Sequence, residues 1–409
     1  METATLPKFM DINSLPKALK RNRIESIDLL RGIVMIIMAL DHIRDYFHYD
    51  AFLYSPTDLN RTSVFLFFTR FITHYCAPVF VFLAGISASI YGSKRSRREL
   101  SFYLLTRGGW LLFAELFIIT LGWTFNPTYP LFNLQVIWAI GISMIILAAI
   151  IYMKRVYILL TGVLLIAAHN LLDNVHVPGN GMASFLWSFL HEPADFVVGR
   201  FNIFVRYPVL PWIGIMAIGY FFGELYKPAY DAVKRKITLL YTGAGAMALF
   251  IILRSYNIYG DAAQWSMQKD TMFSMLSFFN VTKYPPSFLY TLITLGPAMI
   301  FLSMAEKPLN TVTEKIVVFG RVPFFYYVIH LYLIHLFAMI GAIIAGYNWS
   351  DMILQDRVNR VAALKGYGFN LLIVYLVWLA LILFLYPCCK WFDRYKRNHQ
   401  STKSWLTYL

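Results

Sequence analysis

The chain has 409 residues, of which 58% are apolar and only 14% are charged, whereas about 25% of residues are charged in a typical soluble domain. So few charges cannot surround that much apolar surface in a soluble fold. Three cysteines are too few for a secreted disulfide scaffold, and 17% aromatic residues exclude a disordered chain. The composition therefore predicts a polytopic membrane protein. The net charge of +14 does not require nucleic acid as a partner, because membrane proteins gather Lys and Arg in cytoplasmic loops.

Apolar segments long enough to cross about 30 Å of hydrocarbon recur along the whole chain. They predict an all-α polytopic bundle of about ten transmembrane helices, in which the fifth span is short and the ninth is long enough to tilt or break. The predicted spans lie near residues 28–48, 69–92, 102–123, 132–152, 156–173, 207–226, 237–254, 286–305, 316–346 and 367–389.

The positions of Lys and Arg predict the orientation of the bundle. When the N-terminus is assigned to the cytoplasm, each cytoplasmic loop carries a basic pair or cluster, whereas the outer loop 124–131 carries no charge. Both termini are therefore predicted to be cytoplasmic. The expected organisation is a basic arm over 1–26, a transmembrane domain over 27–392 and a basic tail over 393–409.

The first span ends in an unusual group of polar residues. Asp41, Arg44, Asp45 and His48 follow i, i+3, i+4, i+7 and share one helical face, while His42 stands three residues before Asp45. A charge in the hydrocarbon costs at least about 2.5–3.5 kcal/mol, so these side chains are expected to face the interior of the bundle. A solvated helix end is the alternative, but it leaves too short an apolar segment to span. A carboxylate one turn from an imidazole can hold its tautomer and raise its basicity.

Further ionisable residues lie inside other predicted spans. Arg70 and His74 are four residues apart in the second span, and Arg70 alone would be explained by snorkelling to the outer interface. His330 and His335 in the ninth span are five residues apart and do not share a face. Such histidines are often packing residues. Glu115 in the third span could be the partner of a cation or a neutral acid bonded to a neighbouring helix.

Histidine is the recurring ionisable residue on the membrane-embedded and outer side, which favours proton chemistry near neutral pH. No H-x-x-x-H or H-E-x-x-H pair occurs, so a zinc site would have to be assembled from separate helices, and no metal is predicted. The sequence also lacks a Walker loop, a dinucleotide fingerprint and a G-x-S-x-G elbow. Two classes remain: a membrane enzyme with histidine as base or nucleophile, and a proton-coupled transporter of a small anion or sugar. A non-catalytic scaffold would explain none of the intramembrane ionisable groups.

Two segments carry a resemblance to a known family: IESIDLLRGIVMIIMALDHIRDYFH at 24–48 and TRFITHYCAPVFVFLAGISA at 69–88. They resemble bacterial membrane proteins that share the catalytic domain of heparan-alpha-glucosaminide N-acetyltransferase. The segments 207–223, 283–298 and 321–335 are similar to further blocks of that group. The resemblance implies membership of a transmembrane acyltransferase superfamily, whose members pass an acyl group from cytoplasmic acyl-CoA to a sugar on the far side of the membrane.

The resemblance also implies the partners and the roles of residues. It suggests a multi-pass protein of the bacterial cytoplasmic membrane with acetyl-CoA as co-substrate and an extracytoplasmic amino sugar or glycan as acceptor; a homodimer is left open. His42 is the first candidate for base or nucleophile, oriented by Asp41 or Asp45, and His48 is the second. Direct transfer and an acyl-histidine intermediate are both compatible with this assignment. Contacts to the substrates are assigned to Arg44, Arg70, His74, Glu115, His330 and His335, with Arg44 and Arg70 as candidates for stabilising the oxyanion.

Overall fold

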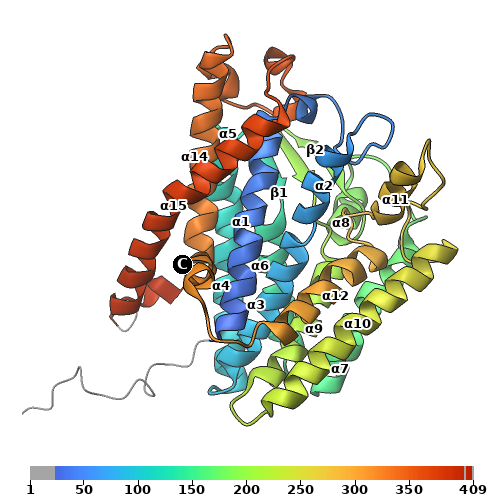
Figure 1. The fold of residues 1–409 in the computed structure, drawn as a ribbon, viewed down its shortest axis with the longest axis vertical. Helices are drawn as coiled ribbons and strands as arrows, with labels where there is room; N and C mark the ends of the chain where they lie inside the picture. The colour runs from blue at the N-terminus through green and yellow to red at the C-terminus, as the bar shows by residue number, and fades with distance from the viewer. Residues whose placement is uncertain (1–23, 400–401, 408–409) are drawn as a thin grey trace, which may run out of the picture.

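The computed structural model describes residues 24–399 and 402–407 and is mostly helical, with 70% helix and 5% strand (Figure 1). Nearly all of the predicted N-terminal arm therefore lies outside the described residues, and the predicted tail begins inside the last helix. The main helices are α1 (Glu25–Phe47), α2 (Val64–Thr73), α3 (Cys76–Gly92), α4 (Arg97–Phe113), α5 (Thr120–Thr124), α6 (Val136–Ile150), α7 (Arg155–Ala168), α8 (Met182–Leu190), α9 (Leu210–Phe222), α10 (Ala232–Tyr256), α11 (Thr271–Phe279), α12 (Phe288–Met304), α13 (Thr311–Arg321), α14 (Pro323–Ile344) and α15 (Leu371–His399).

Six helical segments within the described residues are long and apolar enough to cross a membrane, which supports a multi-pass membrane protein. They are Val64–Gly92, Arg97–Thr124, Arg155–Leu172, Ala232–Tyr256, Pro323–Ile344 and Leu371–His399. Three shorter apolar helices are Val136–Ile150, Leu210–Tyr226 and Phe288–Met304. α1 has the length of a span but carries the charged residues discussed above. The count of about ten crossings and the cytoplasmic position of both termini stay predictions.

The predicted ninth span is two helices. α13 ends at Arg321 and α14 begins with Pro323 in its first turn. Proline is favoured at the first helical position because its missing N–H would have no intrahelical acceptor there, and it disfavours the helical conformation in the residue before it. The break therefore follows from the Val322–Pro323 step, and α14 is free to run in its own direction (Figure 1).

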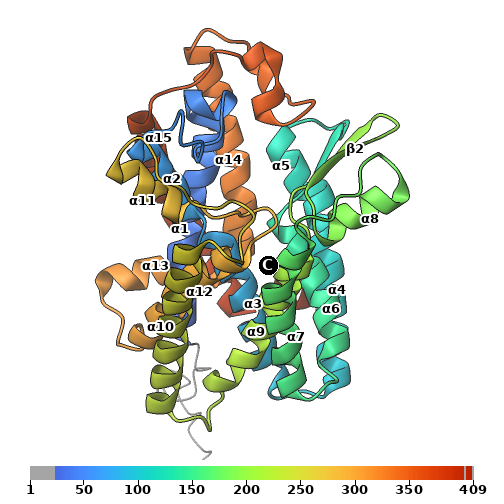
Figure 2. The ribbon, with the colours of Figure 1, turned by 90° about the vertical axis from the view of Figure 1, so that its right-hand side faces the viewer.

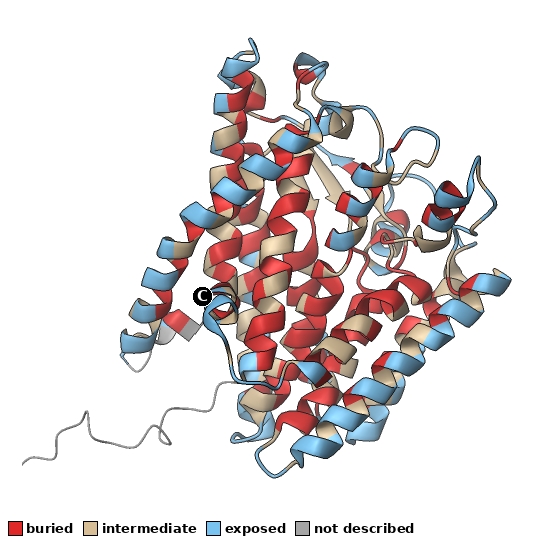
Figure 3. Ribbon diagram, in the orientation of Figure 1, coloured by how far each residue is buried: buried red, intermediate tan, exposed pale blue. Residues whose placement is uncertain are grey.

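α1 forms the centre of the bundle and packs against α2, α3, α13, α14 and α15. α1 and α3 are largely buried, whereas α10 and α15 are exposed along their outer faces (Figure 3). The exposed face of α15 is apolar, with Leu372, Leu376 and Leu383 each more than half exposed. An apolar outer face of this length suits contact with lipid rather than water. α1 is thereby held in the protein interior, where its charged residues do not face the apolar outer surface.

The prediction of an all-α fold is wrong in one detail, because a small sheet lies near the C-terminal end of α1. In the described part of the chain it contains β1 (Leu131–Leu134), β2 (Ala194–Val198) and β3 (Phe201–Val205). β3 lies in the middle, parallel to β1 and antiparallel to β2. Residues 174–206 contain a β-hairpin as well as α8, because the alternating run at 194–205 pairs with the segment before α6 (Figure 2). Strands this short carry little signal in a sequence dominated by apolar helices.

Two glycines allow α1 and α13 to approach closely. A Cβ at Gly320 would overlap the backbone carbonyl of Asp28, and a Cβ at Gly32 would overlap that of Ile316. Small residues at such contacts let helix backbones pack directly against one another in membrane proteins. The contact fixes α13 against the first turns of α1.

Gly320→Ala should therefore destabilise the protein by about 1–3 kcal/mol, because the added methyl group must separate two backbones. Gly245 in α10 is the matched control, since nothing lies within 4 Å of a Cβ built there. Gly245→Ala should be neutral or stabilising by up to about 1 kcal/mol, because alanine is the better helix former. The measurement is the apparent melting temperature of each purified variant in detergent. Equal melting temperatures for Gly320→Ala and the wild type would contradict the proposed contact.

Candidate active site between two cavities

Two histidines from helices far apart in the sequence form the centre of the candidate site. His42 of α1 and His330 of α14 approach each other with 2.8 Å between Nδ1 of His42 and Nε2 of His330. The rings lie 5.0 Å apart at 22°. His330 is fully buried, whereas His42 is partly accessible. The sequence predicted both residues as site residues but not that they would bind each other.

The hydrogen bonds of His330 determine which nitrogen of His42 is reactive. Nδ1 of His330 lies 3.0 Å from the carbonyl oxygen of Tyr326, and a carbonyl can only accept, so this nitrogen carries the proton. In the neutral ring, Nε2 of His330 is then an acceptor, and Nδ1 of His42 must donate to it. A neutral His42 therefore presents an unprotonated Nε2. No hydrogen bond to this nitrogen occurs among the described residues, so its lone pair is available as a base or a nucleophile.

Two aromatic side chains flank His42. The ring of Trp123 lies 4.9 Å away at 71°, and the ring of Tyr327 lies 6.2 Å away at 84°. The indole N–H of Trp123 and the hydroxyl of Tyr327 are buried and lack a hydrogen-bond partner in the part of the chain that the structure describes. Trp123 lines a large outer cavity, and Tyr327 lines a second cavity on the other side. His42 and His330 themselves line neither cavity, but the two aromatic neighbours of His42 line one cavity each.

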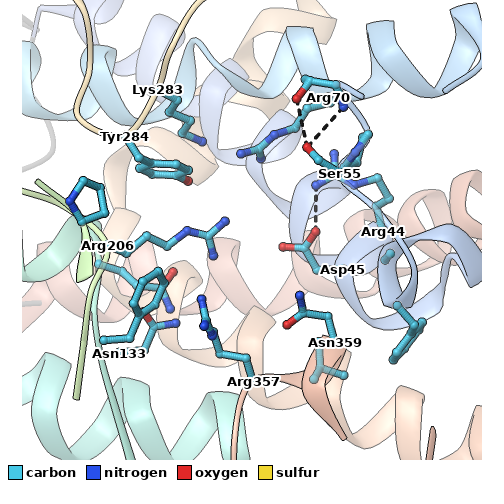
Figure 4. Close-up of a pocket in the computed structure, with 18 of the residues that line it drawn as sticks. Arg44, Asp45, Ser55, Arg70, Asn133, Arg206, Lys283, Tyr284, Arg357 and Asn359 are labelled. Atoms are coloured by element: carbon cyan, nitrogen blue, oxygen red, sulfur yellow. Dashed lines mark hydrogen bonds and ion pairs between the residues drawn. The ribbon is translucent and has the colours of Figure 1, made fainter. Parts of the chain in front are cut away.

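The outer cavity has a volume of about 720 Å³ and lies at the C-terminal end of α1 (Figure 4). Its walls come from the ends of α1, α2 and α5, from β1 and β3, and from the loops around 280–284 and 354–359. Basic and polar side chains from opposite walls face one another across it in the close-up. Those that carry charge or donate hydrogen bonds include Arg44, Asp45, Arg70, His74, Asn133, Arg206, Lys283, Tyr284, Arg357 and Asn359.

One wall of the outer cavity is electrically balanced. Asp41 lies between two arginines, 2.6 Å from Nη1 of Arg70 and 2.6 Å from Nη2 of Arg44. Thr73 donates to the same carboxylate at 2.9 Å, and Asp45 accepts from Arg44 at 2.7 Å. All four charged groups are thus paired, as buried charges must be to remain ionised. Asp41 is an anchor for the arginines and makes no hydrogen bond to His42.

The opposite wall carries positive charge that no carboxylate balances. Arg206 at the end of β3 and Lys283 flank the ring of Tyr284, at 4.8 Å and 5.3 Å from its centre, and neither has a salt bridge among the described residues. Burial acts to raise the pKa of Tyr284, but the positive charges of Arg206, Lys283 and Arg70 outweigh it and lower this pKa to about 7. This wall therefore carries positive charge, and Tyr284 lies between the two cations with a pKa near neutral pH.

The second cavity, of about 370 Å³, opens toward the end of the bundle at which α1 begins. Its inner part is apolar, with Met35, Leu111 and Tyr327 among the lining residues. Its basic residues are Arg31, Arg107, Arg321 and Lys396. The placement of Lys and Arg along the chain predicts that this end is cytoplasmic. The inner cavity combines basic residues at this end with an apolar part that includes Tyr327, the neighbour of His42.

Residues 23–259 match the family of heparan-alpha-glucosaminide N-acetyltransferase, catalytic region, which is more than half of the 409 residues. The chain belongs to this family. It is accordingly a multi-pass protein of a family of membrane acetyltransferases. The matched region includes α1 through α10 and contains His42, whereas His330 lies beyond it. A comparison with curated proteins finds no match.

In this family member, the predicted pairing of His42 with a carboxylate on its own helix does not occur. Asp41 and Asp45 are held by arginines, which are stronger partners for a carboxylate than a neutral imidazole. The structure replaces the expected Asp–His pair by the pair of His42 and His330. His48 ends α1, and its Nδ1 accepts from the backbone N–H of Asp50 at 3.2 Å. It does not line either cavity.

His74 lies in the wall of the outer cavity at the break between α2 and α3. Pro78 stands four residues later and has no N–H to donate to the His74 carbonyl. The hydroxyl of Tyr290 donates to that carbonyl instead, at 2.7 Å. The ring nitrogen Nδ1 of His74 is buried without a partner among the described residues. The helix break thus positions His74 so that its side chain forms part of the cavity wall.

Glu115 and His335 lie outside both cavities and bind backbone groups. The Glu115 carboxylate accepts from the N–H groups of Gln135 and Trp138, at 3.2 Å and 3.1 Å, and so caps the start of α6. His335 has one ring nitrogen 3.0 Å from the Gly122 carbonyl and the other 2.7 Å from the Met352 carbonyl. These contacts join elements to one another, and neither residue lines the space where a substrate would bind.

Five residues of the site were not predicted from the sequence. Trp123 and Tyr327 resemble any other aromatic residue in an apolar span, and no spacing distinguishes them. Arg206, Lys283 and Tyr284 lie in segments predicted as outer loops or span ends. The sequence does not distinguish Arg206 and Lys283 from the other Lys and Arg residues of the predicted outer loops, because their lack of a carboxylate partner is visible only in the structure.

Proposed function

We propose that this protein is an integral membrane acyltransferase that moves an acyl group, in particular acetyl, from cytoplasmic acyl-CoA to an amino sugar or glycan on the other side of the membrane. The observation that supports this proposal is the pair of His42 and His330, because the aromatic neighbours of His42, Trp123 and Tyr327, line two cavities that contain basic residues from opposite ends of α1. A group that enters from one cavity can react at His42 with a molecule bound in the other.

The inner cavity suits the donor. Its basic mouth, which contains Arg31, Arg107, Arg321 and Lys396, would hold the phosphates of CoA. The eleven residues from Arg31 to His42 correspond to about 17 Å of helix. The pantetheine arm, roughly 15–20 Å when extended, is long enough to bring the thioester to His42 while the nucleotide stays at the mouth.

The chemical step is a transfer of the acetyl group with His42 as the base. Nε2 of His42 removes the proton from the amine or hydroxyl of the acceptor, which attacks the thioester carbonyl. The C–S bond then breaks, and the departing thiolate of CoA takes the proton from the imidazolium. In the alternative route, Nε2 attacks the thioester first and the C–S bond breaks to release the CoA thiolate. The acceptor then attacks the acetyl-imidazole, its proton passes to the thiolate, and the bond from the acetyl carbon to Nε2 breaks to restore His42. His330 acts as a positioning residue in both routes, because it fixes the tautomer of His42.

Trp123 and Tyr327 are the best candidates for stabilising the tetrahedral oxyanion. Both flank the ring of His42 and have a buried N–H or O–H donor without a partner among the residues described. Arg44 and Arg70 fit this role less well than the sequence suggested, because their guanidinium groups are held by Asp41 and Asp45.

The outer cavity favours an acceptor that carries an acidic group. Arg206 and Lys283 are cations without a carboxylate partner among the described residues, and they face the balanced wall around Asp41. A phosphate, sulfate or carboxylate on the sugar would pair with them while its amine or hydroxyl points toward His42. Such a contact would orient the acceptor as well as attract it.

The discriminating experiment is acetyl-CoA turnover by purified protein reconstituted in liposomes. Acetyl-CoA is supplied on the side of the Arg31 mouth, and glucosamine or glucosamine 6-phosphate on the other side. We expect CoA release together with an acetylated sugar, and a lower KM for the phosphorylated acceptor. Absence of CoA release with either acceptor, combined with proton uptake driven by the sugar or the anion, would instead establish the proton-coupled carrier.

Substitution of the two histidines should separate a base from its positioning partner. His42→Ala should lower kcat by at least about 100-fold, because general base catalysis contributes roughly 10²–10⁴-fold. His330→Ala should lower kcat by a smaller factor and leave the KM for acetyl-CoA nearly unchanged, because His42 remains but loses its fixed tautomer. His48→Ala is the control on the same helix and should retain wild-type turnover. Full activity in His42→Ala with loss in His48→Ala would transfer the catalytic role to His48.

The charge of Tyr284 should make acceptor binding depend on pH. Below its pKa of about 7 the hydroxyl is neutral and the two cations are available, whereas above it the phenolate neutralises one of them. The KM for glucosamine 6-phosphate should therefore rise severalfold between about pH 6 and about pH 8, beyond the change seen with glucosamine. Tyr284→Phe should keep the low KM across this range. The same pH dependence in Tyr284→Phe and the wild type would show that another group titrates.

A further inference from the structure

A second group of ionisable side chains lies outside the candidate active site, where the end of α7 meets the end of α8. His169 follows α7, Asp173 ends the short 3₁₀ turn after it, and His191 ends α8 just before β2. α8 lies beside β2 in Figure 2. One ligand atom from each of the three side chains lies within 4.8 Å of the other two. The three side chains thus come together from separate elements, and no local sequence motif contains all three.

The two imidazoles of this group are buried without adequate partners. His169 and His191 are each 3% exposed. Both ring nitrogens of His169, and Nδ1 of His191, have no hydrogen-bond partner within residues 24–399 and 402–407. A buried polar atom left unpaired costs roughly 1–3 kcal/mol, so three such atoms in one cluster require a physical explanation. A bound cation would accept the lone pair of one nitrogen of His169, and so would satisfy one of these three atoms.

The carboxylate is arranged as a ligand would be. Oδ1 of Asp173 lies 3.2 Å from Nε2 of His191, and Asn170 donates to Oδ2 at 2.8 Å. Zn²⁺ with tetrahedral bonds of about 2.0–2.1 Å holds its ligand atoms about 3.4 Å apart, which is close to the first distance. A polar group that orients a ligating side chain is usual around metal sites. The side chain of Asp173 is 18% exposed, so the site is open to solvent on this side.

We propose that His169, Asp173 and His191 bind a divalent transition-metal ion, Zn²⁺ in particular, with water in the remaining position. Two imidazoles and one carboxylate form a ligand set that suits Zn²⁺ and does not suit Mg²⁺ or Ca²⁺, which prefer oxygen ligands. The ion would join the end of α7 to the start of the β2–β3 hairpin, which ends next to Arg206. Asn170 also accepts from the backbone N–H of Phe288 at 2.9 Å, close to the segment that carries Lys283. The site would therefore brace the outer wall of the cavity.

The test is Zn²⁺ binding by the full-length protein in detergent after treatment with a chelator and dialysis. We expect one Zn²⁺ per chain by elemental analysis, a saturable titration by calorimetry, and a higher melting temperature with Zn²⁺ than without it. These measurements do not depend on enzymatic turnover, so the metal site and the acyltransferase can fail separately. Absence of stoichiometric Zn²⁺ binding by the wild type would overturn the proposal.

Three variants assign the binding to this cluster. His169→Leu removes two unpaired nitrogens from an apolar site, so it should fold without metal at least as well as the wild type and bind Zn²⁺ at least 10-fold more weakly. Asp173→Asn keeps the size of a partly exposed side chain and should weaken binding to a similar degree. His176→Ala is the control, because His176 is a nearby exposed histidine paired with Glu192 at 2.9 Å. Wild-type affinity in His169→Leu or Asp173→Asn, or loss in His176→Ala alone, would refute the assignment.

Discussion

The need to satisfy every buried polar group inside the protein determines the structure around α1. Hydrocarbon offers no hydrogen bonds, yet α1 carries Asp41, His42, Arg44 and Asp45 within five residues. The two carboxylates form salt bridges with arginines, and the imidazole of His42 forms a hydrogen bond with His330. After these pairings Nε2 of His42 is left without a partner among the described residues. The reactive atom of the proposed mechanism, Nε2 of His42, is therefore the ring nitrogen that the hydrogen bond with His330 does not occupy.

The same reasoning explains why the two histidines differ. Nδ1 of His330 donates to the carbonyl of Tyr326, one turn earlier on the same helix. Because a carbonyl oxygen can only accept a hydrogen bond, this contact fixes the tautomer of His330. His42 has no such local constraint and takes its tautomer from His330. A histidine in place of the more usual carboxylate has a physical advantage here, because it orients His42 without adding another buried negative charge near Asp41.

Much of the helical architecture could be predicted from hydropathy, and the length of the ninth span predicted that it would either tilt or break. The break itself follows from Pro323. The three strands were missed, because the pairing of 131–134 with 201–205 joins segments about seventy residues apart that each alternate too briefly to be recognised. The number of membrane crossings stays a prediction from the apolar segments, and the orientation of the termini stays a prediction from charge placement.

The candidate site shows where sequence spacing stops being informative. The helical repeat of α1 correctly groups Asp41, Arg44 and Asp45, which do interact with one another. It could not reveal that Arg70 competes for Asp41, or that the partner of His42 stands 288 residues away. Spacing along one helix identifies a face, but the choice of partner depends on which other helix meets that face. For the same reason His335, five residues after His330, joins backbone carbonyls and does not contribute to a cavity.

The outer layer of the protein explains how loops can hold a binding site in place. Asp261 accepts from the backbone N–H of Thr282 at 2.8 Å and from the hydroxyl of Ser287 at 2.6 Å, on both sides of Lys283 and Tyr284. Asn170 links the start of α12 to the proposed metal ligands. Side chains thus restrain a segment that has no regular structure of its own. An anion that meets cations already held in position loses less free energy to ordering than one that must immobilise a free loop. In the proposed function, the loop that carries Lys283 and Tyr284 is therefore part of the acceptor-binding surface, and the polar residues around it keep that surface in place.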